Sequence, residues 1–387
     1  MLQSTNQRML SLLILLVLTL TNYMEVKGVD TSDFTFNADV RYSQWVTKSR
    51  MNDYWANTTH DGFAVYNVEG TKITSRRSGG KSELDYVPGL VAKAIVENVQ
   101  YYSQYSWAQS WALPFFYSMA DYGNYFYDKY RSTYGSLDDL NASKVFFGLY
   151  DLTNTGGAYA SNNVVTSANT TKSNAQEALR WAMEGENGTG GIKKHNSTYY
   201  IRDTTSAYTA GHTIVQGGWY HKSSYKNEMW LDGSYMGPAL FAQLRNYKGS
   251  DIIGSDWTIV YRQIQALWEM CWNPTDKLLY HAYAAASHSN YSATWSGFNP
   301  AGGVYHSASY WGRACGWYFL ALIDILEQMD KAGLTGTDKD NYNTLKGHLA
   351  DLAAGLYYTF NAWNLYVWGN DILKSHPRIV IGIDFSL

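Results

Sequence analysis

Cysteine and long basic runs are both scarce in this chain of 387 residues, and each scarcity excludes a class of protein. The two cysteines, Cys271 and Cys315, allow at most one disulfide, so neither a disulfide framework nor a zinc-type cluster is expected. The formal net charge is -3 and no long basic run occurs, which argues against a nucleic-acid-binding surface. A Gly-rich phosphate loop, a Gly-x-Ser-x-Gly elbow and a Cys/His dyad are also missing, so nucleotide use and acyl transfer are not expected.

Long apolar runs are missing too, except at the N-terminus. There Arg8 precedes the apolar run Met9–Leu20, which is typical of a secretory signal and short for a membrane span. We therefore predict a signal peptide over residues 1–28 and one domain over residues 29–387. The mature protein is expected to be secreted, extracellular and free of the membrane.

Asn-x-Ser/Thr sequons agree with secretion, because such sites carry glycans in exported proteins. The predicted glycosylation sites are Asn57, Asn169, Asn187, Asn196 and Asn290. A sixth sequon at Asn141 is not expected to be used, since it lies close to Asp138, a candidate catalytic residue described below.

Aromatic residues, in contrast, are abundant: the chain has 15 Trp and 34 Tyr. Both side chains combine an apolar face with a polar edge, which suits sugar rings that stack on aromatics through C–H faces and hydrogen-bond through hydroxyls. The simpler explanation, that aromatics fill helix contacts, accounts for roughly half of them.

The hydrophobic pattern predicts one helix after another, with little strand alternation and no βαβ rhythm. The predicted helices cover residues 39–55, 84–102, 106–130, 138–152, 173–184, 229–247, 255–272, 310–332 and 338–357. Most of the Gly, His and Trp residues fall in the loops between them. Helices as scaffold, with polar and aromatic residues gathered in loops, favour an all-α helical barrel or toroid.

Three acids are candidates for chemistry. Asp232 is the only acid in the apolar and aromatic run Met229–Pro238, where burial of an ionised carboxylate is costly. Its alternative role is to interact with a helix dipole. Asp138 and Asp139 lie at a helix start, where either could be a cap. A second acid reaching the same cavity as Asp232 would provide the pair of titrating groups that sugar hydrolysis generally requires.

Two histidines and an arginine lie in aromatic surroundings. His221 lies between Tyr and Lys, and His281 lies between Tyr and Ala; their spacing does not match a metal site, so no metal is predicted. Arg313 follows Trp311 at the start of a long apolar helix, which suits a bidentate contact to a carboxylate or a hydroxyl pair. The alternative for Arg313 is a structural ion pair.

Three motifs together resemble glycoside hydrolase family 105, the unsaturated rhamnogalacturonyl hydrolases, and the related family 88 unsaturated glucuronyl hydrolases. The motifs are Gly-Gly-Trp-Tyr-His-Lys at 217–222, Trp-Leu-Asp-Gly-x-Tyr-Met-x-Pro at 230–238 and Trp-Gly-Arg-x-x-Gly-Trp-Tyr at 311–318. The segment Asp85–Leu90 and the sequence Asp138-x-x-Asn141 followed by Lys144 are also similar to family segments.

This resemblance implies an (α/α)6 barrel of the six-hairpin glycosidase type with a pocket at one end. It also implies hydration of a vinyl ether: the substrate carries a C4=C5 double bond in the uronic acid at its non-reducing end. A proton is added at C4, water attacks C5, and the resulting hemiketal opens and releases the rest of the oligosaccharide. The implied substrate is a product of pectin (rhamnogalacturonan) lyase action. We expect no cofactor, and we expect the protein to act as a monomer.

Carried over residue by residue, the resemblance implies Asp232 as the general acid/base and Asp138 as the second catalytic acid. The implied pocket residues are Trp230, His221, His281, Trp311, Arg313, Trp317 and Tyr86. An aromatic, half-dry pocket would raise the pKa of the acid toward working pH.

The chain departs from the family pattern at several positions. Cys315 stands where the family usually has Asn, and Ala284 where it often has Asp. The closing hairpins expected after about residue 358 are not evident, so a barrel that is incomplete at its C-terminus is an open expectation. Two alternative functions follow: an endo-α-mannanase-like hydrolase on the same barrel, which would use the Asp138–Asp139 pair, or an inactive carbohydrate-binding or truncated product.

Overall fold

A computed structural model gives the fold of the chain, which divides by compactness into two units, Met1–Trp45 and Val46–Leu387. The structure describes residues 65–66, 72–73, 86–101, 136–153, 200–201, 216–248, 256–284, 305–367 and 379–380, all in the second unit. The predicted signal peptide and the predicted helices 39–55, 106–130 and 173–184 lie outside the described residues.

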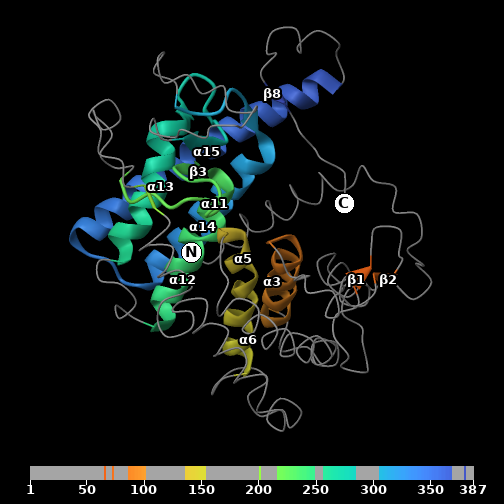
Figure 1. Ribbon diagram of the computed structural model, residues 1–387, viewed down its shortest axis with the longest axis vertical. Coiled ribbons are helices and arrows are strands. Elements are labelled where there is room, and N and C mark those ends of the chain that lie inside the picture. Colours follow the sequence, from red (N-terminus) through yellow and green to blue (C-terminus); the bar gives the residue numbers. More distant parts are fainter. Residues whose placement is uncertain are drawn as a thin grey trace. The chain divides into compact units, whose positions relative to one another are not determined.

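Helices make up most of the described residues (Figure 1). They are α3 (Tyr86–Tyr101), α5 (Leu137–Asn141), the 3-10 helix η3 (Ala142–Lys144), α6 (Val145–Thr153), α11 (Leu231–Met236), α12 (Pro238–Lys248), α13 (Asp256–Cys271), α14 (Gly312–Lys331) and α15 (Gly336–Val367). This content confirms the all-α class expected from the sequence. Among the described helices, none has the length and apolar character needed to cross a membrane.

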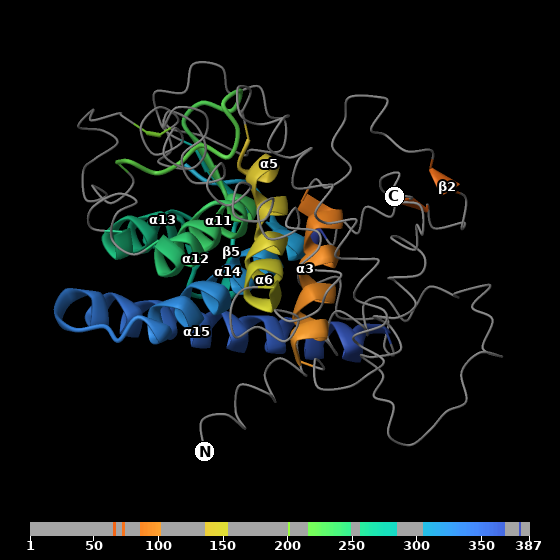
Figure 2. The same cartoon turned by 90° about the horizontal axis from the view of Figure 1, so that it is seen from below.

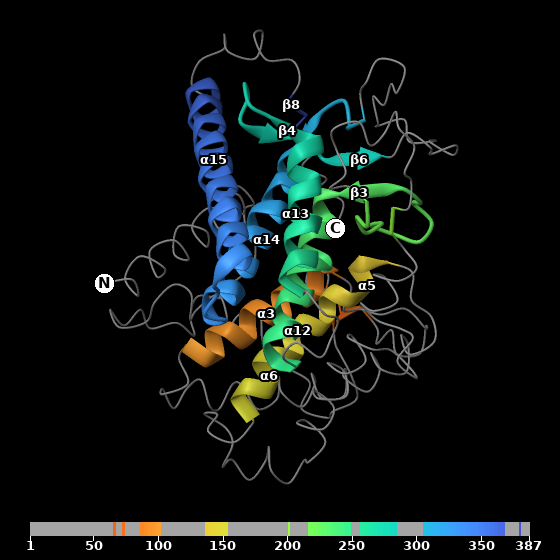
Figure 3. The same cartoon turned by 90° about the vertical axis from the view of Figure 1, so that its left-hand side faces the viewer.

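Helix α14 contacts four other helices: α11, α12, α13 and α15. Helix α13 in turn packs against α12 and α15, so that α13, α14 and α15 run side by side (Figure 3). On the other side of α11, helix α3 packs against α5, η3 and α6, and Figure 2 shows α3 and α6 next to each other. Helices α5 and α11 are in direct contact. This contact brings together the two helices that carry the candidate acids.

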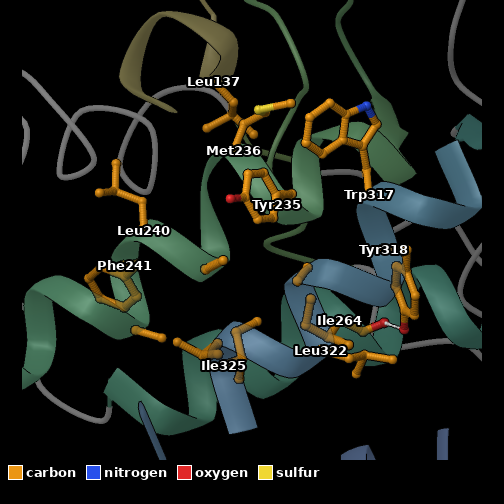
Figure 4. Packing of buried hydrophobic residues seen from close by; sticks show 14 of the residues in the cluster. Leu137, Tyr235, Met236, Leu240, Phe241, Ile264, Trp317, Tyr318, Leu322 and Ile325 are labelled. Atoms are coloured by element: carbon orange, nitrogen blue, oxygen red, sulfur yellow. Dashed lines mark hydrogen bonds between the residues drawn. The ribbon is translucent and has the colours of Figure 1, made fainter. Parts of the chain in front are cut away.

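The core lies where α11, α12, α13 and α14 meet (Figure 4). Met236, Leu240, Leu322 and Ile325 are all fully buried there. Burial of each such side chain contributes roughly 1.5–3 kcal/mol to folding. The hydroxyl of Tyr318 donates to the carbonyl of Ile264 at 2.9 Å, so the polar tip of this buried aromatic is satisfied.

The single helix predicted over 229–247 is wrong, because this stretch contains a strand and two helices. Helix α11 ends at Met236 with Gly237 as its C-cap, and Pro238 begins α12, where the missing N–H of proline costs little. Gly237 also permits a close approach, since a Cβ placed there would lie 2.7 Å from Leu137 Cδ2. The helix that carries Asp232 is therefore short and tightly packed against α5.

The loop predicted between residues 272 and 310 contains several short strands. In antiparallel pairs, β3 (Glu228–Trp230) pairs with β6 (Ala282–Ala284), and β4 (Trp272–Asn273) pairs with β5 (Leu278–Leu279). β1 (Val65–Tyr66) pairs with β2 (Lys72–Ile73), and β7 (Tyr310–Trp311) pairs in parallel with β8 (Ile379–Val380). These strands are too short to show alternation in the sequence. For this reason β5 and β6 were assigned to a loop, and β3 and β7 overlap the predicted helices 229–247 and 310–332.

The last described helix also differs from expectation. Helix α15 runs to Val367, ten residues beyond the predicted end at 357, and Tyr357 and Tyr358 on it are exposed. Residues 379–380 pair with β7, directly before Arg313, so part of the stretch that lacked a recognisable pattern pairs with a strand next to the candidate site.

Candidate active site

Asp232 lies in the first turn of α11, directly after strand β3. The residue before the helix, Trp230, has an extended backbone, and the N–H of Leu231 donates to the carbonyl of His281 at 3.0 Å. The carboxylate is buried, and its Oδ2 atom has no hydrogen-bond partner among the described residues. The backbone thus delivers an acid into the interior without a fixed partner for one of its oxygens.

The environment of Asp232 favours its protonated form. Burial raises the pKa of the carboxyl, and the nearby charge of Asp138 raises it further, while His221 and Arg313 act in the opposite direction. The net effect is a raised pKa. Asp232 is therefore suited to donate a proton.

Asp138 has the opposite character. The N-cap of α5 is Ser136, whose Oγ accepts from the N–H of Asp138 at 3.1 Å. The predicted capping role of Asp138 or Asp139 is therefore filled by Ser136. The Asp138 side chain instead places Oδ2 3.4 Å from Nε2 of His221 and 3.1 Å from Nζ of Lys222. Burial raises the pKa of this carboxyl, but His221 and Lys222 outweigh that effect and bring it to about 2. Asp138 is thus ionised at ordinary pH.

The pKa values of two carboxyl groups in one region are therefore shifted in opposite directions. Such a separation identifies an acid and an anionic partner in many enzymes that run acid–base chemistry near neutral pH. The two acids influence each other directly, since the negative charge of Asp138 is one reason why the pKa of Asp232 is raised. The prediction that a second acid acts with Asp232 thus has a physical basis in this arrangement.

His221 connects the two acids. Its Nε2 faces Asp138, and its Nδ1 is buried without a hydrogen-bond partner in the described part of the chain. A Cβ placed on Gly233, the residue after Asp232, would lie 3.2 Å from that Nδ1. Gly233 therefore leaves room for the imidazole against α11.

Backbone hydrogen bonds hold this arrangement in place. The N–H of Leu137 donates to the carbonyl of His221 at 3.0 Å, and the N–H of His221 donates to the carbonyl of Glu228 at 3.2 Å. An isolated bridge also joins Ser136 to Lys222. The start of α5, the segment around 221 and strand β3 are thereby fixed to one another through main-chain groups.

An aromatic wall adjoins the acids. Trp230 stacks on His221 with ring centroids 5.3 Å apart and on Tyr225 at 5.5 Å. His281 meets Trp230 edge-on at 6.0 Å and Trp311 edge-on at 5.9 Å. The sequence-predicted residues Trp230, His221, His281 and Trp311 are thus brought together, as a sugar-binding wall requires.

His281 is an uncharged member of this wall. The hydroxyl of Ser307 accepts from its backbone N–H at 2.9 Å, and its Nδ1 lies 3.4 Å from the carbonyl oxygen of Ser309. Burial lowers the pKa of the imidazole to about 4, although the contact to Ser309 acts in the other direction. His281 can therefore offer a hydrogen bond to a hydroxyl, but no positive charge at neutral pH.

Arg313 supplies a positive charge at the start of α14. Its guanidinium lies over the Trp311 ring, 4.4 Å from the ring centre, and the residue is exposed. A guanidinium held flat on an aromatic ring keeps its N–H groups available for a bidentate contact. It also influences the pKa of Asp232, which places it in the same region as the acids.

Comparison with known proteins relates part of the chain to a glycoside hydrolase family. Residues 191–363 match the family model described as Glycosyl Hydrolase Family 88. This segment is therefore similar to glycosyl hydrolase family 88. It includes Asp232, both site histidines and Arg313, while Asp138 and Tyr86 precede it. This match supports the resemblance to family 88 that the motifs predicted.

Two solved structures are similar to the chain. One is the glycoside hydrolase from family 105 of C. acetobutylicum ATCC 824, with 18% identity and a TM-score of 0.43 over 72% of this chain and 61% of that one. The other is a possible member of the GH105 family from Klebsiella pneumoniae subsp. pneumoniae MGH 78578, with 14% identity and a TM-score of 0.44 over 87% of this chain and 71% of that one. The chain thus spans less than two thirds of the length of the first.

Sequence reasoning missed two residues of the candidate site. Lys222 contacts Asp138, and the buried carboxylate of Glu228 accepts from the indole N–H of Trp230 at 2.9 Å. Glu228 pairs with Ala284 across the β3–β6 ladder. Lys222 was visible in the sequence as the last residue of the 217–222 motif, whereas Glu228 could be placed only once the strand pairing was known.

Two predicted pocket residues have a different or undescribed setting. Trp317 is buried in the core and packs against Tyr235 with ring centroids 5.0 Å apart (Figure 4). Tyr86 begins α3, but its side chain lies outside the described residues. A pocket-lining role for either residue therefore stays a prediction.

The cysteines and the sequons complete the inventory. Cys271 and Cys315 are both buried free thiols, and Cys315 Sγ donates to the carbonyl of Leu279 at 3.3 Å. Asn141 is buried, in keeping with its exclusion as a glycan site. The five predicted glycosylation sites lie outside the described residues. No group of three or more His, Cys, Asp or Glu residues suited to a metal occurs in the described ranges.

Proposed function

We propose that the protein removes a 4,5-unsaturated uronic acid from the non-reducing end of oligosaccharides by hydrating its vinyl ether. The observation that carries this proposal is the buried, protonation-prone Asp232 beside the ionised Asp138. Protonation of carbon requires an acid that still holds its proton near neutral pH, which an ordinary exposed Asp does not.

The reaction needs few groups. Asp232 gives its proton to C4, and positive charge develops at C5 and the ring oxygen. The resulting Asp232 carboxylate accepts a proton from the water that attacks C5, so the acid is regenerated. The hemiketal at C5 then opens and releases the aglycone. Ionised Asp138 stabilises the developing positive charge and orients His221, to which it lies close.

The substrate class follows from charge and aromaticity. A uronate carries a carboxylate, and Arg313 on Trp311 offers it a bidentate contact. Trp230 and Trp311 supply aromatic surface beside the acids, and His281 supplies a neutral hydrogen-bonding group. Among uronides we propose the unsaturated galacturonyl-rhamnose products of pectin lyases, with unsaturated glucuronides as the close variant.

The mannanase alternative receives less support. It would use the adjacent pair Asp138–Asp139, but successive residues on a helix point about 100° apart. The charge of Asp138 instead raises the pKa of Asp232, which lies on a different helix. Release of reducing ends from a saturated mannan would nevertheless favour that reading.

The direct experiment uses lyase-made oligosaccharides and follows the ultraviolet absorbance of their conjugated double bond. Wild-type protein should remove this absorbance, and the Asp232→Asn variant should lose at least 10²-fold of the rate. Binding of the oligosaccharides without turnover, unaffected by Asp232→Asn, would instead support a carbohydrate-binding protein.

We also propose that the protein is secreted as a monomer after removal of residues 1–28. The apolar run after Arg8 and the sequons support secretion. Expression in a eukaryotic secretory host, with N-terminal sequencing and glycosidase treatment of the medium protein, tests this. An unprocessed N-terminus on protein retained in the cells would contradict it.

A further inference from the structure

One fully buried amine has no place in the chemistry proposed above. Lys144 is only 2% exposed and is the last residue of η3, which continues directly from α5. Burial of a lysine is costly unless its amine has partners, and such side chains are almost never fully buried without them. The partners of Lys144 therefore indicate what the residue does.

Both contacts of the Lys144 amine are with one residue of α11. Nζ donates to the carbonyl of Tyr235 at 2.5 Å and lies 3.2 Å from the centre of the Tyr235 ring. An amine satisfies these contacts whether it is charged or neutral, because both forms can donate to a carbonyl and to a ring face. The Tyr235 ring also packs against Trp317, with ring centroids 5.0 Å apart.

The positions of these residues in their helices are informative. Tyr235 follows Asp232 by three residues, which places it about one turn further along α11. Lys144 follows Asp138 by six residues, at the end of the same run of helix, α5 and η3. The Lys144–Tyr235 contact therefore joins the two helices that carry the two acids.

Neighbouring charges are already paired with a different lysine. Lys93 on α3 lies 2.7 Å from Glu97 and 3.6 Å from Asp324. Burial lowers the pKa of Lys144 well below its usual value, Asp324 and Glu97 oppose this effect, and Lys93 adds to it. In the described part of the chain, no salt bridge includes Lys144 itself, so its amine is committed to Tyr235.

We propose that Lys144 is a positioning residue that fixes Asp138 and Asp232 relative to each other by tying η3 to α11. The inference rests on the proposed function for its catalytic meaning. Its structural content, a link from Lys144 to the environment of Asp232, is independent of any substrate.

The test measures the titration of Asp232 without substrate, by NMR of protein labelled with carbon-13 at aspartate carboxyls. Asp232→Asn identifies the signal. In Lys144→Met, which retains the apolar length of the side chain, α11 is released and the apparent pKa of Asp232 should fall by about half a unit or more toward its ordinary value. Lys93→Met is the matched control, since it removes a neighbouring buried amine whose salt bridges are with Glu97 and Asp324, and it should leave the Asp232 titration unchanged.

Activity provides a second readout. With an unsaturated uronide, Lys144→Met should lower kcat roughly tenfold, leave KM within about twofold, and move the alkaline limb of the pH profile to lower pH, because misplacement of catalytic groups affects the chemical step. Lys93→Met should keep the wild-type profile. If Lys144→Met does not fold, Lys144→Gln and Tyr235→Leu take its place; each weakens one part of the contact and should shift the Asp232 titration in the same direction.

The result that overturns the inference is a folded Lys144 or Tyr235 variant whose Asp232 titration superimposes on that of wild type. An equal shift in Lys93→Met would overturn it as well, because the effect would then be general to the buried charges. If wild-type protein consumes no unsaturated uronide but the NMR shift is found, the proposed function fails while the positioning link stands.

Discussion

The Nε2 atom of His221 lies 3.4 Å from Oδ2 of Asp138, while Nδ1 of the same imidazole lies close to Gly233, on the helix that carries Asp232. The His221 side chain thereby lies between the helices that carry Asp138 and Asp232, which are almost a hundred residues apart in the sequence. The burial of Asp232 and the ion pairing of Asp138 then push the pKa values of the two acids in opposite directions. Several of the following predictions test the consequences of this relationship.

Asp138→Asn should reduce activity and change its pH dependence. The substitution removes a negative charge that raises the pKa of Asp232, so this pKa should fall. An acid must be protonated to act, so activity should be lost at a lower pH than in wild type, and kcat should fall by roughly 10²–10⁴. A pH–rate profile of both proteins measures this. An alkaline limb at the wild-type pH would show that the charge of Asp138 does not act on Asp232.

Arg313→Ala should weaken binding of a uronate substrate more than it slows the chemistry. Loss of a charge-assisted hydrogen bond costs about 1.5–3 kcal/mol, which corresponds to an increase in KM of roughly 10- to 100-fold. Arg313→Lys keeps the charge but loses the planar fork, and should give an intermediate effect.

The substrate methyl ester is the control for this prediction, because it lacks the carboxylate charge. Wild-type protein should discriminate against the ester, and Arg313→Ala should not. Equal discrimination by both proteins would assign the carboxylate to another group, with Lys222 as the next candidate because it lies beside the ionised Asp138.

His348 should make the free energy of unfolding depend on pH. Its ring stacks on Trp268 at 3.9 Å and its Nε2 lies 2.7 Å from Oε1 of Gln265. Burial lowers its pKa to about 4, although Asp351 acts against this shift. The unfolded chain titrates near 6.5, so the stabilisation is complete above that pH and is lost as pH falls from 6.5 to 4.

The expected loss from His348 is on the order of 1 kcal/mol after allowance for solvent, since part of the ring is accessible. Denaturant unfolding at several pH values measures it. His348→Phe keeps a ring on Trp268 but cannot titrate, so its free energy of unfolding should fall less steeply over this range. Parallel curves for the two proteins would mean that His348 does not contribute.

The two thiols should be inert in the native protein. Burial raises the pKa of Cys315 to about 12 and that of Cys271 further, so neither forms a thiolate readily. A thiol-specific reagent should therefore label neither cysteine under native conditions and both in denaturant. Rapid native labelling of Cys315 would show that the region beside Asp232 opens to solvent.

The sequence predicted much of the helical framework because its apolar periodicity is strong. The ranges of α3, α13 and α14 were close to those predicted, since their apolar residues recur at helical spacing over sixteen residues or more. The split of 229–247 was not predicted, because a three-residue strand leaves no periodic signal. Gly237 and Pro238 were visible in the sequence, but their effect on α11 depends on how closely Leu137 packs.

The site residues that belong to a sequence motif could be predicted, whereas those that depend on tertiary pairing were harder to predict. Asp232 stood out as one acid in an apolar run, and the structure buries it. Asp138 had an equally good local explanation as a cap, which Ser136 turned out to provide. The roles of Glu228 and Lys144 depend on partners far away in the sequence or on strand pairing, which spacing along the chain does not reveal.

The measurement that tests the central claim most directly is product analysis in D2O with an unsaturated uronyl disaccharide. If Asp232 protonates C4, the first product observed by NMR carries deuterium on one face of C4 only, the ultraviolet absorbance disappears as the aglycone is released, and Asp232→Asn forms this product at least 10²-fold more slowly. Ordinary cleavage of the glycosidic bond would first release a monosaccharide that still absorbs, and would later place deuterium on both faces of C4. That second result would contradict the assignment of Asp232 as a proton donor to carbon.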